Sequence, residues 1–175
     1  MKRLAKYIKR AIQIGAAESK LIDTKYIVTG NWVRIKCQYG CDCYGRRLTC
    51  PPFSPTPEYT KKMIGQYKKA LILTYYAKPG EERAKRRKMH KAVAELEREI
   101  FLDGYYKAFS MVAGPCRFCV PCDVNNPCKF PELARPAMEA CGIDVYKTAR
   151  NVGIKMAVVK STKDISKYCC LILIE

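Results

Sequence analysis

The densest group of chemically reactive side chains is a set of four cysteines near the middle of the second half of the chain. Cys116, Cys119 and Cys122 follow one another at gaps of two residues, and Cys128 comes after five more. Successive gaps of two residues let a compact loop surround one face of a cubic iron–sulfur cluster, as in bacterial ferredoxins. Soft thiolate ligands favour iron–sulfur centres, zinc or cuprous copper. We therefore predict a 4Fe–4S cluster on these four cysteines, with zinc as the alternative metal.

Another four cysteines lie earlier in the chain, within fourteen residues of one another. Cys37, Cys41, Cys43 and Cys50 are separated by three, one and six residues, and two prolines follow Cys50. Such a group can hold a second cluster or a zinc ion. The single residue between Cys41 and Cys43 is a tight gap for chelation of one zinc, which makes one of the two a bystander. Cys141, which precedes a glycine, is either a reserve ligand in place of Cys128 or a structural residue, and the sequence favours neither.

The overall composition restricts the classes of protein that this chain can be. It has 175 residues, of which 49% are hydrophobic, with eleven cysteines, one histidine and a formal net charge of +17. One histidine excludes a zinc-hydrolase site built from several imidazoles. An odd number of cysteines and no convincing signal peptide argue against an extracellular disulfide framework and for a reducing, cytoplasmic compartment. The longest uncharged apolar run, 168–174, is far shorter than the roughly 18 residues of a membrane-spanning helix.

The positive charge is concentrated partly around the cysteines, where it can favour the thiolate form. The flanking cations are Arg34, Lys36, Arg46, Arg47, Arg117 and Lys129. The remaining reactive residues have simpler interpretations. His90 is predicted to be a solvated residue of a long helix, and the adjacent Cys169 and Cys170 are predicted to be small buried hydrophobic residues on a strand.

Hydrophobic periodicity and turn residues predict the elements that must position these cysteines. Helices are predicted at 2–17, 56–69, 81–103, 131–140 and 144–152, and strands at 26–28, 32–36, 70–76, 107–113, 154–160 and 168–174. The alternation of strands and helices predicts a single α/β domain over 1–175, with a mixed, largely parallel sheet flanked by helices and a closing antiparallel hairpin. The cysteine-rich loops 37–57 and 114–130 both follow predicted strands, so we expect them at one edge of the sheet.

The chain also resembles a known family across nearly its whole length. The matching stretches are 32–37 with Gly40-Cys41, Tyr44-Gly45, Cys50-Pro51-Pro52, 55–58, 96–99, 104–109, Gly114-Pro115-Cys116-Arg117-x-Cys119, 131–136 and 138–145. The family is an uncharacterised, cysteine-rich prokaryotic group described only as predicted metal-binding proteins. The resemblance implies a metal or iron–sulfur protein, of a kind commonest in anaerobic prokaryotes, without an established activity. It implies as ligands Cys37, Cys41, Cys50, Cys116, Cys119, Cys122, Cys128 and Cys141, with Cys43 as an extra.

Three hypotheses about function follow. The first is an iron–sulfur protein that holds one cluster or two and passes electrons, sulfur or metal to a partner protein. The second is an enzyme in which one cluster iron lacks a cysteine ligand and binds substrate. The third is a zinc-stabilised nucleic-acid-binding module, which the charge of +17 motivates.

Overall fold

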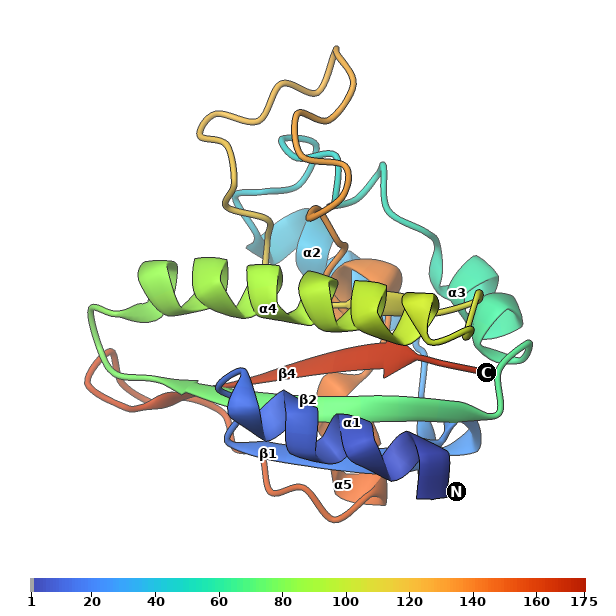
Figure 1. Cartoon of the computed structure of the whole chain (residues 1–175). Coiled ribbons are helices and arrows are strands. Elements are labelled where there is room, and N and C mark those ends of the chain that lie inside the picture. The colour runs from blue at the N-terminus through green and yellow to red at the C-terminus, as the bar shows by residue number, and fades with distance from the viewer. Residues whose placement is uncertain (1) are drawn as a thin grey trace.

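The computed structural model describes residues 2–175 (Figure 1). The α-helices are α1 (Lys2–Gln13), α2 (Asn31–Gly40), α3 (Pro57–Ile64), α4 (Glu82–Leu102) and α5 (Val145–Asn151). The strands are β1 (Glu18–Asp23), β2 (Lys69–Ala77), β3 (Phe109–Met111) and β4 (Ser166–Leu173). Two short 3-10 helices, η1 (Thr24–Tyr26) and η2 (Glu139–Cys141), complete the elements. None of the helices in this part of the chain has the length and apolar character needed to cross a membrane.

The four strands form an antiparallel sheet with the order β1-β2-β4-β3, so the prediction of a largely parallel sheet is wrong. The chain does run from β2 through α4 to β3, and β2 and β3 point the same way because both are antiparallel to β4. The two strands are not neighbours, however, because β4 lies between them. Leu73 pairs with Cys170 on one side of β4, and Met111 pairs with Leu171 on the other.

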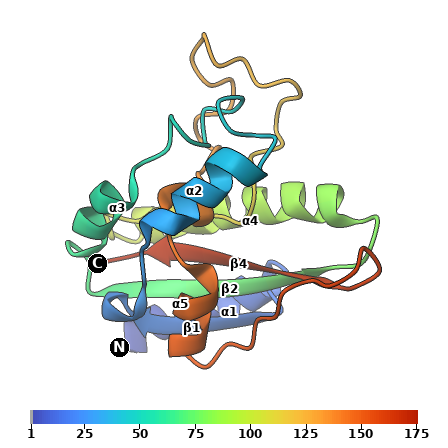
Figure 2. The ribbon, with the colours of Figure 1, turned by 180° about the vertical axis from the view of Figure 1, so that it is seen from behind.

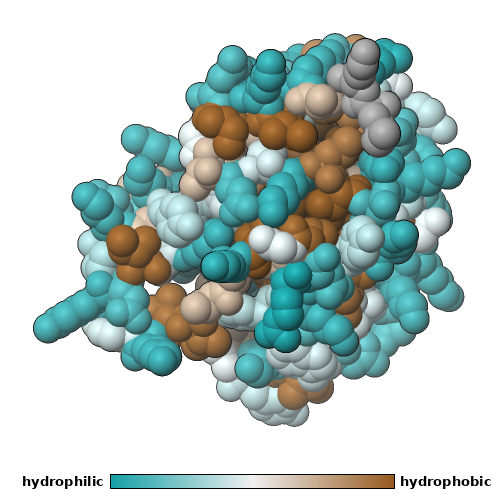
Figure 3. Space-filling model, turned by 90° about the horizontal axis from the view of Figure 1, so that it is seen from below, coloured by the Kyte–Doolittle hydropathy of each residue, from teal (hydrophilic) through white to brown (hydrophobic). Residues whose placement is uncertain are grey.

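Helices cover both faces of the sheet (Figures 1 and 2). On one face α1 and α4 pack on side chains such as Leu71, Leu73 and Ile172. On the other face η2 and α5 pack on Ile72 and Leu171. Alternate residues of one strand thus enter opposite cores, as the period of two requires, and β2 and β4 are hydrophobic almost throughout because both of their faces are covered. Seen from below, the outer surface is mostly hydrophilic around small apolar patches (Figure 3).

Several predicted elements are confirmed. They are the helices at 2–17 (α1), 56–69 (α3), 81–103 (α4) and 144–152 (α5), and the strands at 70–76 (β2), 107–113 (β3) and 168–174 (β4). Three of them are shorter than predicted, since α1 ends at Gln13, α3 ends at Ile64 and β3 covers Phe109–Met111. Their caps explain where two of them begin. The side chain of Thr56 accepts a hydrogen bond from the Tyr59 N–H at 3.2 Å, and Asp144 Oδ1 accepts one from the Lys147 N–H at 2.9 Å.

The predicted strands at 26–28 and 32–36 are wrong, because these residues lie in η1 and α2 and in the connection between them. The alternation of apolar and basic residues in 32–36 is typical of a half-buried strand, but tertiary contacts decide otherwise. Val33 is buried, and the Arg34 guanidinium donates to the carbonyl oxygens of Pro55 at 3.0 Å and Ala140 at 3.2 Å. These contacts fix α2 against η2 and against the segment that precedes α3. The first cysteine-rich segment therefore begins inside a helix and does not follow a strand.

The other differences between the predicted and observed elements concern residues 131–140, residues 154–160 and β1. Residues 131–140 form turns and the start of η2 instead of a helix, and 154–160 form no strand, so the predicted closing hairpin does not exist. β1 was not predicted, because Ile22 is its one buried side chain and it shows no clear alternation. An edge strand covered only in part by α1 carries little hydrophobic signal.

The two cysteine-rich segments nevertheless project together from one side of the molecule, above α2 and α4 in Figure 1. The second segment follows β3, which is an edge strand. Its two ends are joined by backbone hydrogen bonds of Val112, whose N–H donates to Pro136 at 2.9 Å and whose carbonyl accepts from Met138 at 2.8 Å. The chain between them forms a closed loop that presents its cysteines as one unit.

Candidate metal centre

The four cysteines of the second loop line one cavity. Cys116 is buried, and Cys119, Cys122 and Cys128 are partly buried. The cavity is also lined by Arg47, Leu48 and Thr49 from the first cysteine-rich segment and by Phe118, Phe130 and Ala134. The two rings have centroids 5.9 Å apart. The structure thus brings together all four thiols that the spacing predicted as ligands, and it encloses them with apolar side chains. We call this group the second cysteine site.

A short network of turns shapes the outer part of this loop. Asp123 accepts hydrogen bonds from the Asn125 N–H at 3.1 Å and from the Asn126 side chain at 2.8 Å. Gly114, at the base of the loop, has a φ of +67°, and a Cβ there would lie 3.3 Å from the Arg86 guanidinium. Glycine is suited to this position because other residues rarely adopt a positive φ.

The four cysteines of the first segment line a separate cavity of about 100 Å³. Cys37 is on α2, Cys41 directly follows α2, and Cys43 and Cys50 are buried in the loop beyond it. Glu139, Gly114, Pro115 and Ala140 are among the residues that form the opposite wall. The sequence left Cys43 as a bystander or an extra, but its side chain lies in this cavity with the other three. We call this group the first cysteine site.

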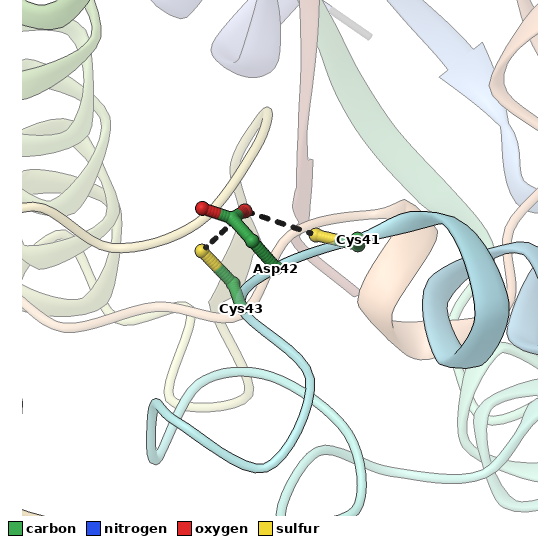
Figure 4. Close-up of side chains that lie close together, drawn as sticks. All are labelled: Cys41, Asp42 and Cys43. Atoms are coloured by element: carbon green, nitrogen blue, oxygen red, sulfur yellow. Dashed lines mark hydrogen bonds between the residues drawn. The ribbon is translucent and has the colours of Figure 1, made fainter.

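The first cysteine site also contains a carboxylate that the sequence analysis did not single out. Asp42 lies between two cysteines, and its Oδ1 is 3.4 Å from Cys43 Sγ and 4.0 Å from Cys41 Sγ (Figure 4). In residues 2–175 these three side chains are the one group of potential ligand atoms that all lie within 4.8 Å of one another. The one-residue gap between the cysteines, which argued against chelation by both, is what brings Asp42 into reach of both thiols.

One side chain joins the two cysteine sites. Arg47 is buried, and its Nε donates to Cys43 Sγ at 3.4 Å. Its Nη1 donates to the carbonyl oxygens of Cys116 at 2.9 Å and Cys119 at 3.3 Å. A buried guanidinium requires negative charge and acceptors around it. Arg47, predicted only as one of several flanking cations, is therefore a structural link between a thiol of the first site and the backbone of the second.

Burial raises the pKa of most thiols in both sites. Loss of water is the main cause for Cys50, whose pKa is raised to about 12, and for Cys37, Cys43, Cys116 and Cys119. Nearby cations act in the opposite direction, since Arg34 lowers the pKa of Cys37 and Arg47 lowers those of Cys43, Cys50 and Cys119. These thiols therefore stay protonated until a metal ion binds and displaces the protons, as is usual at thiolate metal sites.

Cys141, the reserve ligand, does not line either cavity. It is the last residue of η2 and is fully buried in the core with Met138 and Ile143, and burial raises its pKa to about 12. Cys169 and Cys170 are also buried, which confirms the prediction that they are core residues. All eleven cysteines of the sequence are free thiols.

The comparison with known families places this geometry in context. Residues 20–174 match a family described as predicted metal-binding protein (DUF2284). The chain belongs to this family. No curated protein and no solved structure matched the chain. Both cysteine sites lie inside the matched region, so membership in the family and the clustering of thiols point to the same property, which is metal binding.

The prediction that His90 is a solvated helix residue is wrong. It is 1% exposed, and its Nε2 is 2.9 Å from the carbonyl oxygen of Ala113, just before the second loop. Burial is the main cause that lowers the pKa of His90, so the ring is neutral at pH 7 and donates from Nε2. The ring of Phe118 stands edge-on to it, with centroids 6.3 Å apart. The stripe Met89-Val93-Leu96 could have revealed this burial, because His90 also lies next to Val93 and Ala94 on the inward side.

Proposed function

We propose that this family member is an iron–sulfur protein whose second cysteine site holds a 4Fe–4S cluster. The observation that carries the proposal is the convergence of Cys116, Cys119, Cys122 and Cys128 on one cavity. Its other lining residues are Arg47, Thr49 and a set of apolar side chains. When bound, such a cluster accepts and releases single electrons. The thiols of this loop would hold it, Phe118 and Phe130 would exclude water from it, and the Arg47 guanidinium would offset its negative charge.

The distances between thiols favour a cluster over a single zinc ion at this site. Thiolates around one tetrahedral zinc lie about 3.8 Å apart, since each Zn–S bond is about 2.3 Å long. In the described part of the chain, no three sulfur atoms of the second site lie within 4.8 Å of one another. A polynuclear core spaces its thiolates more widely than one ion does. The wider separation of these thiols supports the proposal of a cluster at this site.

We further propose that the first cysteine site holds a second metal centre, either another cluster or zinc. Its cavity is lined by Cys37, Cys41, Cys43 and Cys50, and the Asp42 carboxylate adds an oxygen donor next to two thiols. Oxygen and sulfur donors together are found at zinc sites. They also suit an iron that is not held by cysteine alone, and this is the observation that favours the second candidate function, catalysis at an open metal position.

The role that we propose is transfer of electrons to or from an acidic protein partner in a reducing, cytoplasmic compartment. Arg87 lies over the Phe118 ring at 5.8 Å, and Arg117 and Lys129 belong to the second loop itself. Together with the net charge of +17, these cations would steer an acidic surface toward the cluster. Electron transfer between such partners slows as salt screens the charges.

Metal analysis of protein purified without oxygen tests the proposal. We expect iron and sulfide in equal amounts, a brown colour and an absorption band that bleaches on reduction. Colourless protein that contains zinc alone would contradict it. If such protein also bound RNA or DNA with an affinity that falls steeply with salt, the nucleic-acid-binding hypothesis would replace it.

A further inference from the structure

A groove of about 490 Å³ lies beside the first cysteine site. It is bounded by α2, by the beginning of α5, by the irregular segment 156–159 and by the beginning of β4. Its volume is within the usual range of pockets for small organic molecules, about 300–1,000 Å³. The groove shares no lining residue with the second cysteine site, and it is the larger of the two cavities that contain Cys37 and Cys41.

The walls of the groove expose an unusual amount of apolar surface. Trp32 is 51% exposed, Val158 is 68% exposed, and Tyr146 and Val159 are also exposed. The deeper part is formed by buried residues such as Val33 and by the half-buried Tyr168. Aromatic and aliphatic side chains left in water around one concave surface are typical of a ligand site.

Four charged side chains line this groove, those of Lys36, Glu139, Asp144 and Lys167, and two of them have no fixed partner. Asp144 accepts the hydrogen bond from the Lys147 N–H that caps α5. Lys36 Nζ lies 5.4 Å from the centroid of the Trp32 ring and forms no ion pair in the described part of the chain. Lys167, in contrast, is held by Glu18 at 3.3 Å and by the Lys155 carbonyl at 2.9 Å. At the inner wall Glu139 Oε2 is buried without a hydrogen-bond partner among the described residues. The groove thus offers a free cation beside an aromatic ring near its mouth and an unpaired carboxyl oxygen deeper inside.

The inner wall of the groove is also the wall of the first cysteine site. Cys37, Cys41 and Glu139 line both cavities. A molecule that fills the groove therefore lies against the proposed metal centre, and its innermost polar group can bond to Glu139.

We propose that the groove binds a small planar aromatic molecule that carries an anionic group. Its ring stacks on Trp32 and contacts Val158 and Tyr146, which buries apolar surface that is now in water. Its anionic group pairs with Lys36, which the net charge of +17 assists. This assignment goes beyond the proposed function, because it holds whichever metal occupies the neighbouring cysteines.

Trp32 is the one tryptophan of the sequence, so its fluorescence reports directly on the groove. The test adds 1-naphthoate to the full-length, metal-loaded protein and follows quenching of Trp32. We expect saturable quenching. The uncharged analogue 1-naphthylmethanol should bind about tenfold more weakly, and Lys36→Gln should weaken binding of naphthoate by a similar factor. Lys62→Gln, an equally exposed position on α3, is the matched control and should bind as the wild type does.

A second pair of variants places the ligand in the groove. Val158→Asp puts a negative charge on the groove wall and should abolish quenching at the concentrations that saturate the wild type. Ile165→Asp changes a residue of similar exposure, 59% against 68%, which directly precedes β4 and lies outside the groove, and should leave binding unchanged. Quenching that does not saturate, or equal effects of the two variants, would overturn the proposal. Protein without iron but with normal quenching would sink the cluster proposal and support this one.

Discussion

The two cysteine sites have the same number of cysteines but are built in different ways. In the second site, all four thiols come from one loop whose ends are joined through Val112. In the first site, Cys37 comes from a helix, the other thiols come from the loop after it, and Glu139 of η2 forms the opposite wall. The second site is local and enclosed, and the first is assembled from several elements and open to a groove. The roles proposed above follow this contrast, with electron transfer at the enclosed site and binding of a small molecule beside the open one.

The largest effect should come from single thiols, because a missing ligand removes a metal centre outright. Cys122→Ser should lose about four iron atoms per chain and keep the metal of the first site. Cys41→Ser should do the reverse. Iron, zinc and sulfide analysis of the two variants, purified side by side, measures both losses. Equal losses in both variants would show that the eight thiols form one interdependent centre instead of two.

The second largest effect should come from loss of the Arg47 guanidinium, which joins the two sites. Arg47→Gln leaves the Cys116 and Cys119 carbonyls without their charged donor and should lower the free energy of unfolding by about 2 kcal/mol. It should also reduce the metal content of both sites. Arg46→Gln is the matched control, because Arg46 is exposed and should change stability by no more than about 0.5 kcal/mol. Chemical denaturation measures both changes. If Arg47→Gln is as stable as Arg46→Gln, Arg47 does not act as a structural link between the two sites.

Replacement of the Asp42 carboxylate should have a smaller effect, confined to the first cysteine site. Asp42→Asn keeps the size of the side chain but removes the negative charge beside Cys41 and Cys43, and it should weaken metal binding at this site about tenfold. The second site should be unaffected. Competition with a chelator, followed by metal analysis, measures the change. An effect on the second site alone would mean that Asp42 acts through the shared arginine and not as a donor.

The smallest effect concerns the histidine beneath the second site, which has no counterpart in the first. Burial lowers the pKa of His90 below the value of about 6.5 expected in the unfolded chain. The unfolded state therefore binds more protons, and stability should fall as the pH drops below about 6.5, by no more than about 1.4 kcal/mol per pH unit. His90→Gln, whose amide can still donate to Ala113, should lose this dependence. Unfolding curves at several pH values with the metal retained decide between the two outcomes.

The sequence predicted most elements whose signal is local. The apolar run of β2, the stripe and length of α4 and the capped start of α3 are each specified by nearby residues. The position of β4 between β2 and β3 is not, because antiparallel pairing with strands far away in the chain leaves no periodic mark on the segment itself. For the same reason the sequence predicts a strand at 32–36, where the structure has α2. The helical form of α2 depends on contacts of Arg34 with Pro55 and Ala140.

The features of the two cysteine sites can likewise be divided into those with a local sequence signal and those that depend on long-range contacts. The regular spacing of Cys116, Cys119, Cys122 and Cys128 predicts that they form one group, and in the structure they line one cavity. The contributions of Asp42 and Glu139 and the burial of His90 depend on how separate segments meet. A carboxylate between two cysteines can be noticed in the sequence, but nothing local indicates that Glu139 lies opposite Cys37.

The place of β4 in the sheet has a consequence for biosynthesis. The ribosome makes both cysteine-rich segments before it makes β4, yet β3, at the base of the second loop, pairs with no strand but β4 in the described residues. Until β4 has left the exit tunnel, the loop is attached to an unpaired strand, and its thiols are open to oxidation and to binding of unintended metal ions. Assembly of any metal centre on this loop therefore has to wait until β4 has been made and has paired with β3.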